Sequence, residues 1–168
     1  MIKRIIKDLI LADYGRKKVI VLLGARQVGK TTLLSELQDG TDKALFLNCD
    51  NVDDVLALEG RTSTELKHLL SSYDLAFIDE AQRVKNIGLT LKMIGDLKLS
   101  TQVVVTGSSS LDMADEINEP ATGRLIEYNL YPFSLSELAV ASSEREENRL
   151  LESRMIYGLY PEVVTEPA

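Results

Sequence analysis

A glycine-rich segment that ends in a lysine and two threonines carries the clearest chemical signal in the chain. Residues Gly24 to Thr31 read Gly-Ala-Arg-Gln-Val-Gly-Lys-Thr and match the Walker A pattern G-x-x-x-x-G-K-[ST]. The glycines let the backbone curl so that successive N–H groups point at phosphate oxygens, and a following helix N-terminus adds a positive field. Lys30 is expected to reach the β and γ phosphates, and the Thr31 hydroxyl to coordinate Mg²⁺. The residues expected to bind the nucleotide are Gly24, Ala25, Arg26, Gln27, Val28, Gly29, Lys30, Thr31 and Thr32.

Two acidic residues after a short apolar segment are the expected partners of this phosphate loop. Residues Leu75 to Ile78 are apolar, and Asp79 and Glu80 follow in the arrangement known as Walker B. Ligands of open α/β folds bind at the carboxyl ends of the strands, which is where this pair would lie. Asp79 is expected to hold Mg²⁺, usually through water, and Glu80 to orient and deprotonate a water that attacks the γ phosphate. Without the loop, an apolar run followed by Asp-Glu is a weak pattern, and a surface turn is as good an interpretation as a functional site.

A hydroxyl-rich turn after a third apolar segment supplies a candidate sensor of the γ phosphate. The segment Val103–Val105 runs into Thr106, Gly107 and Ser108. Ser108, with Thr106 as the second choice, is expected to sense the γ phosphate or to hold the attacking water. The alternative is that a serine here caps a helix predicted from Leu111 to Ile117.

One arginine and a group of aspartates complete the polar candidates. Arg124 precedes the last predicted strand, and its guanidinium is a candidate arginine finger that acts within its own subunit or across an interface. A surface or ion-paired arginine is an equal alternative. Asp50, Asp53 and Asp54 have no spacing that demands a metal, and we expect them to lie in a solvated loop.

Apolar runs and helical patterns alternate along the chain and would position these residues. Strands are predicted where short runs rich in β-branched or aromatic residues occur, at Val19–Leu23, Ala44–Leu47, Leu75–Ile78, Val103–Val105 and Leu125–Leu130. Helices are predicted at Ile2–Ile10, Thr31–Leu37, Ser63–Ser71, Ile87–Leu97, Leu111–Ile117 and Ser142–Tyr157, with capping boxes that begin at Thr62 and Ser134. This order predicts an α/β fold, a three-layer sandwich with a mainly parallel five-stranded sheet and helices on both faces.

Composition limits the classes of function. The 168 residues are 45% hydrophobic and 27% charged, which fits one soluble globular domain and disfavours disordered, fibrous and coiled-coil classes. A net charge of −7 argues against binding many phosphates of a duplex, although six basic and two acidic groups among residues 1–20 permit a local basic contact. A single cysteine excludes an intrachain disulfide. No apolar run approaches the length of about 20 residues that a membrane span needs, so the expected location is the cytoplasm.

In these motifs the chain resembles prokaryotic AAA+ type ATPases whose N-terminal P-loop domain precedes a separate C-terminal domain. The resemblance extends over almost the whole chain as an ordered set of motifs: Gly24–Thr32, Phe77–Gln82, Thr106–Ser109, Thr122–Arg124, Tyr131–Ser134 with Glu137, and Tyr157–Gly158 with Pro161 and Glu162. The sequence departs from the family at Ala25, where proline is frequent and where the expected contacts come from the backbone. Because the family continues into a lid and a C-terminal domain, residues 1–168 are expected to be the P-loop ATPase domain of a longer protein.

The resemblance also implies a function and assigns roles. It implies ATP as the nucleotide, Mg²⁺ as the metal, homo-oligomers as one state of the protein, and a sensor strand between the loop strand and the Asp79 strand. It implies that Glu80 is the catalytic base, Ser108 the first sensor and Arg124 the finger candidate. The expected activity is hydrolysis of Mg-ATP to ADP and phosphate, coupled to conformational change. The alternative is a regulatory switch that binds ATP or ADP with negligible turnover; a kinase would need an acceptor pocket that no motif marks.

Overall fold

A computed structural model describes residues 2–38, 40–108 and 123–165 of the protein. Its centre is a five-stranded sheet in the order β2-β3-β4-β1-β5, in which all neighbouring strands are parallel. The strands are β1 (Val19–Gly24), β2 (Ala44–Asn48), β3 (Leu75–Asp79), β4 (Gln102–Gly107) and β5 (Leu125–Leu130). The five predicted strands are confirmed, and β4 lies between β1 and β3 as the family resemblance implied.

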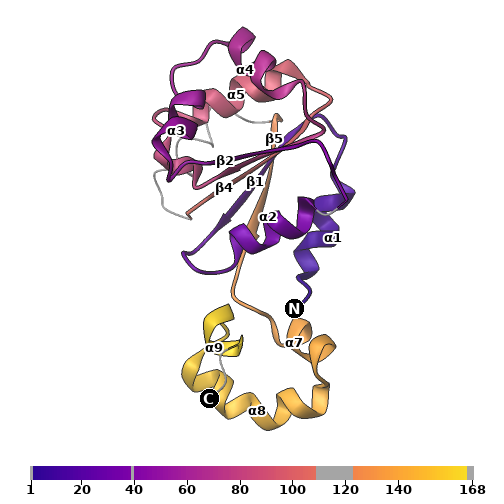
Figure 1. The fold of residues 1–168 in the computed structure, drawn as a ribbon. Coiled ribbons are helices and arrows are strands. Elements are labelled where there is room, and N and C mark those ends of the chain that lie inside the picture. The colour runs from indigo at the N-terminus through magenta and orange to yellow at the C-terminus, as the bar shows by residue number, and fades with distance from the viewer. Residues whose placement is uncertain (1, 39, 109–122, 166–168) are drawn as a thin grey trace.

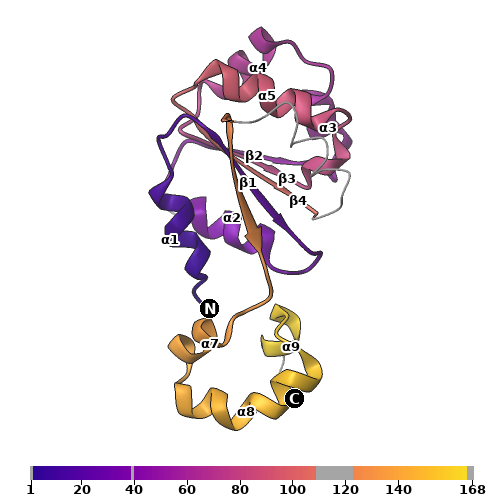
Figure 2. The ribbon, with the colours of Figure 1, turned by 180° about the vertical axis from the view of Figure 1, so that it is seen from behind.

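Helices cover both faces of the sheet and make the predicted three layers (Figure 1). On one face lie α1 (Ile5–Ala12) and α2 (Lys30–Gln38). On the other lie α3 (Val52–Leu58), α4 (Ser63–Leu70) and α5 (Ile87–Leu97), as Figure 2 shows from behind. The predicted helix at Leu111–Ile117 lies outside the described residues.

The sheet separates two hydrophobic cores, because successive strand residues point to opposite faces. In β1, Val19, Val21 and Leu23 pack with the helices α3 to α5, whereas Ile20 and Leu22 pack with α1 and α2. All six residues of β1 are buried. Burial on both faces explains why this strand is a continuous apolar run rather than an alternating one.

Helix α3 corrects the prediction for the aspartate cluster. Asn51 caps this helix by accepting a hydrogen bond from the Asp53 N–H, and Asp53 and Asp54 lie in its first turn. Carboxylates there interact favourably with the positive end of the helix. The Asp54 side chain also accepts a hydrogen bond of 3.0 Å from the Asn48 N–H, which closes the turn between β2 and α3. The expectation of a solvated loop at residues 53 and 54 is therefore wrong.

Three further helices form a helical unit beside the carboxyl edge of the sheet (Figure 1). They are α7 (Leu135–Ala141), α8 (Glu144–Tyr157) and α9 (Pro161–Thr165). The predicted capping box is present at the start of α7, where Ser134 and Glu137 bond reciprocally. A backbone bond of 2.9 Å from the Phe133 N–H to the Leu159 carbonyl joins the segment before α7 to the segment before α9. Within the described ranges, no helix is long and apolar enough to cross a membrane.

Candidate phosphate-binding site

The predicted phosphate loop connects the carboxyl end of β1 to the first residue of α2. A Cβ atom at Gly24 would lie 2.7 Å from the Leu130 carbonyl oxygen, so β5 passes too closely for any other residue. Gln27 and Gly29 both have left-handed backbone conformations, with φ of 63° and 99°. Left-handed conformations are easy for glycine and unfavourable for glutamine, so the loop holds Gln27 under backbone strain. These residues give the loop the curl that the sequence predicted.

Lys30 is buried within the loop that it is expected to serve. Its side chain is only 5% exposed, and its ammonium group donates hydrogen bonds of 3.0 Å to the carbonyls of Gly24 and Ala25. Both acceptors are neutral backbone groups, whereas a phosphate oxygen would bring full negative charge. The Lys30 ammonium group therefore lies where it could replace its hydrogen bonds to two carbonyl oxygens with hydrogen bonds to a phosphate.

Asp79 joins the loop to the neighbouring strand. Its Oδ2 atom accepts a hydrogen bond of 2.7 Å from the Thr31 hydroxyl, and its Oδ1 atom accepts one from the Thr106 hydroxyl. The residue is 3% exposed. The structure thus brings together the two residues predicted to hold a metal, Thr31 and Asp79. It also gives Thr106, the second choice on β4, a direct contact that the sequence did not indicate.

Glu80 is held by both its backbone and its side chain. Its φ of 54° is left-handed, and its N–H donates a hydrogen bond of 3.1 Å to the Thr106 hydroxyl. Its carboxylate accepts a hydrogen bond from the Gln82 side chain, whose carbonyl oxygen accepts one of 3.2 Å from the Ser108 N–H. Gln82 therefore bridges the predicted base and the predicted sensor. This role of Gln82 was not predicted from the sequence, in which the available signal was a polar residue two positions after Glu80.

A pocket of about 380 Å³ opens between the loop and the ends of β3 and β4. It is lined by Arg26, Lys30, Asp50, Glu80, Gln82, Arg83 and Ser108. This volume lies within the range of small-molecule sites. The lining carries three cationic side chains and two carboxylates. The cations are suited to binding a polyanionic ligand, and a carboxylate is suited to act as a base in a reaction of that ligand. Arg83 and Asp50, which were not predicted as site residues, form an exposed ion pair of 3.3 Å at its rim.

Cys49, which precedes Asp50 at the rim of this pocket, is a buried free cysteine with a structural role. Its side chain is 2% exposed, and burial together with the carboxylates of Asp54 and Asp79 raises the pKa of its thiol to about 12. The thiol is therefore neutral at physiological pH and is not a nucleophile.

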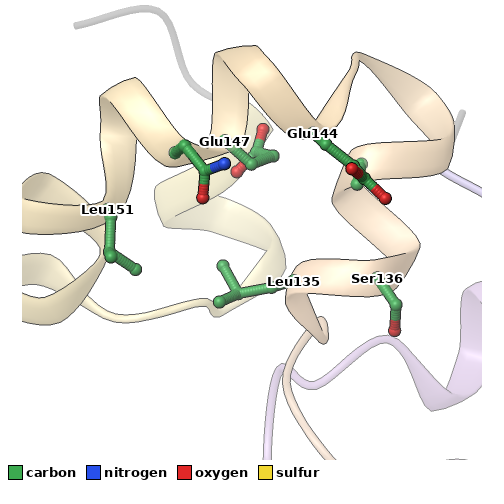
Figure 3. A pocket seen from close by; sticks show the side chains of 7 residues that line it. Leu135, Ser136, Glu144, Glu147 and Leu151 are labelled. Carbon is green, nitrogen blue, oxygen red and sulfur yellow. The ribbon is translucent and has the colours of Figure 1, made fainter.

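The helical unit has a separate pocket of about 300 Å³ between α7 and α8 (Figure 3). Leu135 and Leu151 supply its apolar wall, and Ser136, Glu144 and the buried Glu147 supply polar side chains. None of its lining residues comes from the phosphate loop or from the ends of β3 and β4. It is therefore separate from the pocket at the phosphate loop.

Arg124 lies at the amino edge of the sheet, opposite the phosphate loop, which argues against one of its two predicted roles, that of a finger within its own subunit. Its carbonyl accepts a hydrogen bond of 3.1 Å from the Val19 N–H at the start of β1. The loop begins at the far end of that strand, about 16 Å away at the usual rise of about 3.3 Å per residue. The guanidinium instead pairs with Asp96, 2.5 Å away. Because β5 is parallel to β1, the residue before β5 must lie at the amino edge.

Four of the six basic residues in the N-terminal segment lie beside acidic partners. Lys3 pairs with Asp8 at 2.8 Å, Lys7 pairs with Glu36 at 3.5 Å, and Arg16 pairs with Asp13 at 3.0 Å. Arg4 is buried against Glu137. These pairs weaken the case for a nucleic-acid contact that the local charge excess permitted.

Comparison with known proteins supplies a family and a fold. The family model described as an AAA domain matches residues 16–139, more than half of the chain. The Walker-type ATPase of Pyrococcus abyssi superposes with a TM-score of 0.62 at 17% identity, covering 96% of this chain and 65% of that one. The ORC1 protein of Aeropyrum pernix, solved in complex with DNA, superposes with a TM-score of 0.53 at 15% identity, covering 88% and 50%. At these identities the likeness is one of fold.

A curated relative extends well beyond the length of this chain. An uncharacterized protein of Haemophilus influenzae is 27% identical over an alignment of 161 residues, and the match covers 86% of this chain and 40% of the relative. The chain therefore spans about two fifths of the length of this relative.

Proposed function

The chain belongs to the AAA domain family of P-loop ATPases, and we propose that it binds Mg-ATP, hydrolyses it to ADP and phosphate, and couples the nucleotide state to a conformational change. The observation that carries the proposal is the hydrogen bond of 2.7 Å between Thr31 Oγ1 and Asp79 Oδ2. This bond joins the end of the loop to the acidic end of β3, so the two halves of a nucleotide site meet in one place.

The donor set at this point fits a magnesium ion. Mg²⁺ prefers oxygen ligands, and Thr31 and Asp79 supply a hydroxyl and a carboxylate within hydrogen-bond distance of each other. Thr106 donates to the other oxygen of Asp79 and holds the carboxylate in place. When bound, the metal would neutralise charge on the β and γ phosphates.

The chain's own residues account for the remaining steps of hydrolysis. Loop N–H groups and Lys30 bind the phosphates and withdraw charge from the γ group. Glu80 accepts one proton from a water molecule while the oxygen of that water forms a bond to the γ phosphorus. The bond between the γ phosphorus and the β–γ bridging oxygen breaks, which releases ADP. Gln82 holds the Glu80 carboxylate at the pocket, and Ser108 is the proposed sensor at the end of β4.

The second candidate is a nucleotide switch with negligible turnover. The observation that favours it is the position of Arg124, which leaves Arg26 and Arg83 as the arginines that line the pocket in the described part of the chain. Arg83 is already paired with Asp50 there. A switch would bind ATP and ADP through the same loop and hold them without cleavage.

The deciding experiment compares ATP turnover and nucleotide affinity in the parent chain and three variants. Lys30→Ala should lose both turnover and most of the affinity, because it removes the buried phosphate ligand. Glu80→Gln should keep the affinity and lose turnover by about 10²-fold or more, because it removes the base. Glu152→Gln, an exposed change on α8, is the matched control and should behave as the parent.

Each outcome of this experiment selects one function. Turnover in the parent that is lost in Glu80→Gln supports hydrolysis. Binding without turnover in the parent supports the switch, in which Glu80→Gln changes little. Absence of ATP binding to the parent would refute both.

A further inference from the structure

Arg4, at the N-terminal end of α1, is a buried cation that contacts the phosphate loop at the Val28 carbonyl. Its side chain is 8% exposed, although it lies just before the first turn of α1. One end of its guanidinium donates to the Val28 carbonyl at 3.4 Å, and the other donates to the Tyr131 carbonyl. The ring of Phe133 lies 4.6 Å from the guanidinium carbon. A cation is rarely buried in this way unless several partners compensate for the lost water.

Glu137 is the partner that compensates for the charge of Arg4. The Arg4 Nε and Glu137 Oε1 atoms are 3.3 Å apart, and the Glu137 side chain is 7% exposed. Burial lowers the pKa of the Arg4 guanidinium, and the carboxylate of Glu137 opposes that shift. Glu137 Oε1 also accepts a hydrogen bond of 2.9 Å from the Ile5 N–H, and its Oε2 atom accepts one from the Ser134 N–H at the cap of α7.

Together these contacts tie the phosphate loop to the start of α1 and to the helical unit α7–α9. The same unit also lies close to the loop at a second place, since a Cβ atom added at Gly29 would lie 3.8 Å from the Pro161 ring at the start of α9. Figures 1 and 2 both show the N-terminal end of the described chain beside α7. The loop and the helical unit are thus connected by buried charge as well as by the chain itself.

The bond to Val28 sets the direction of a phosphate-binding group. The Val28 carbonyl and the Gly29 N–H belong to one planar trans peptide, so they point in opposite directions. Because Arg4 draws the carbonyl toward α1, it turns the Gly29 N–H away from α1. The Gly29 N–H is one of the loop donors expected to face a phosphate.

We propose that Arg4 is a positioning residue that orients the phosphate loop through Val28 and, through Glu137, transmits occupancy of the loop to α7–α9. The inference rests on the proposed nucleotide binding. A phosphate that pulls on the Gly29 N–H rotates the Val28 peptide, and the guanidinium carries that displacement to Glu137, Tyr131 and Phe133. Breaking a buried pair is costly, so the pair moves as a unit rather than separating.

The test measures amide hydrogen exchange by mass spectrometry with and without Mg-ADP, a ligand that avoids turnover. In the parent chain, Mg-ADP should slow exchange both in residues 24–32 and in residues 131–165. The main variant is Arg4→Met/Glu137→Gln, which removes both charges together, keeps a similar volume and retains one amide oxygen, which can accept from either the Ile5 or the Ser134 N–H. It should bind Mg-ADP about tenfold more weakly, as the loss of one charge-assisted bond predicts.

The decisive readout is where exchange slows in the variant at saturating Mg-ADP. Slowing should persist in residues 24–32 and be lost in residues 131–165. The matched control is Lys3→Met/Asp8→Asn, which neutralises an exposed ion pair at the start of α1. This control should keep both responses. Equal slowing of residues 131–165 in parent and main variant would overturn the inference.

A conservative substitution distinguishes positioning from simple packing. The variant Arg4→Lys keeps the charge, but an ammonium group cannot reach two carbonyls and a carboxylate as the planar guanidinium does. It should remain folded and give an intermediate response in residues 131–165, and it also serves if the double variant fails to fold. A full response in Arg4→Lys together with a full response in Arg4→Met/Glu137→Gln would contradict the role. If Mg-ADP does not bind the parent, the proposed function fails first, and direct titration detects that separately.

Discussion

The Thr106 hydroxyl offers a sharp test of how the acidic end of β3 is organised. It lies in a side chain that is fully buried, donates to Asp79 Oδ1 and accepts a hydrogen bond of 3.1 Å from the Glu80 N–H. Thr106→Val removes this hydroxyl while keeping the shape of the side chain. The change leaves one oxygen of Asp79 and one backbone N–H of Glu80 without the partners that they have in the native protein.

The cost can be worked from these two lost contacts. A buried polar group left without its partner costs about 1–3 kcal/mol. Water entering from the pocket would satisfy part of this need, so we expect a loss of about 2–4 kcal/mol in the free energy of unfolding. In a chain of this size, that corresponds to a fall in Tm of roughly 4–16 °C. We also expect turnover to fall about tenfold or more, because both acids lose a group that fixes their orientation.

The matched control is another buried threonine next to the same strand. Thr101 precedes β4 and donates to the carbonyls of Leu70 and Tyr73 at 3.0 and 2.8 Å. Thr101→Val should lower stability by a similar amount and leave turnover per folded molecule unchanged. The assays are thermal unfolding and ATP turnover, both compared below the lower Tm. If Thr106→Val and Thr101→Val reduced stability equally and neither affected turnover, the proposed role of Thr106 would be refuted.

Three other predictions concern the loop, the buried thiol and the far edge of the sheet. Gly24→Ala should abolish nucleotide binding or unfold the chain, because the added Cβ would lie 2.7 Å from the Leu130 carbonyl oxygen. Isothermal titration measures the binding, and circular dichroism measures the folding. A folded variant that binds ATP normally would contradict this prediction. Because the pKa of Cys49 is raised to about 12, its contribution to stability is complete below about pH 9 and is lost as the pH rises toward 12, since the unfolded thiol ionises first. Urea unfolding between about pH 8 and 10 should therefore show a decline approaching 1.4 kcal/mol per pH unit, which Cys49→Ala should flatten, and an unchanged slope would count against it. Arg124→Ala should leave ATP affinity at low protein concentration unchanged, because Arg124 lies at the far edge of the sheet; a tenfold loss there would show that the assignment of edges is wrong.

The three central strands of the sheet, β3, β4 and β1, were predictable because they are buried on both faces. A segment such as Val19–Leu23 has no polar residue to suggest another element, and glycine ends it. Helix α3 was missed for the opposite reason. It has seven residues, Val52 and Leu56 are 70% and 56% exposed, and its cap at Asn51 has the same local pattern as a turn. A short helix with an exposed apolar face does not show the periodicity that identifies an amphipathic one.

The site was predictable where it depends on strand direction and unpredictable where it depends on distant contacts. In a parallel sheet the residues that follow each strand share one edge, which brings Asp79, Thr106 and the loop together. The same rule, applied to the residue before β5, would have placed Arg124 at the opposite edge. By contrast, Arg4 and Glu137 are separated by most of the chain. The capping-box pattern predicted a bond from Glu137 to Ser134 but contained no information about Arg4.

The order of strands in the sheet differs from their order in the chain, and this has a consequence for synthesis. β1 pairs with β4 and β5, so its edges stay open until Gln102 has left the ribosome, about 80 residues after Gly24. At roughly 5–20 residues per second, the six apolar residues of β1 wait on the order of 4–16 s for a partner. Such a strand, unpaired and uncharged, is a binding site for chaperones and a starting point for aggregation. Yield in a cell-free system should therefore depend on added chaperone more than the stability of the finished fold would suggest.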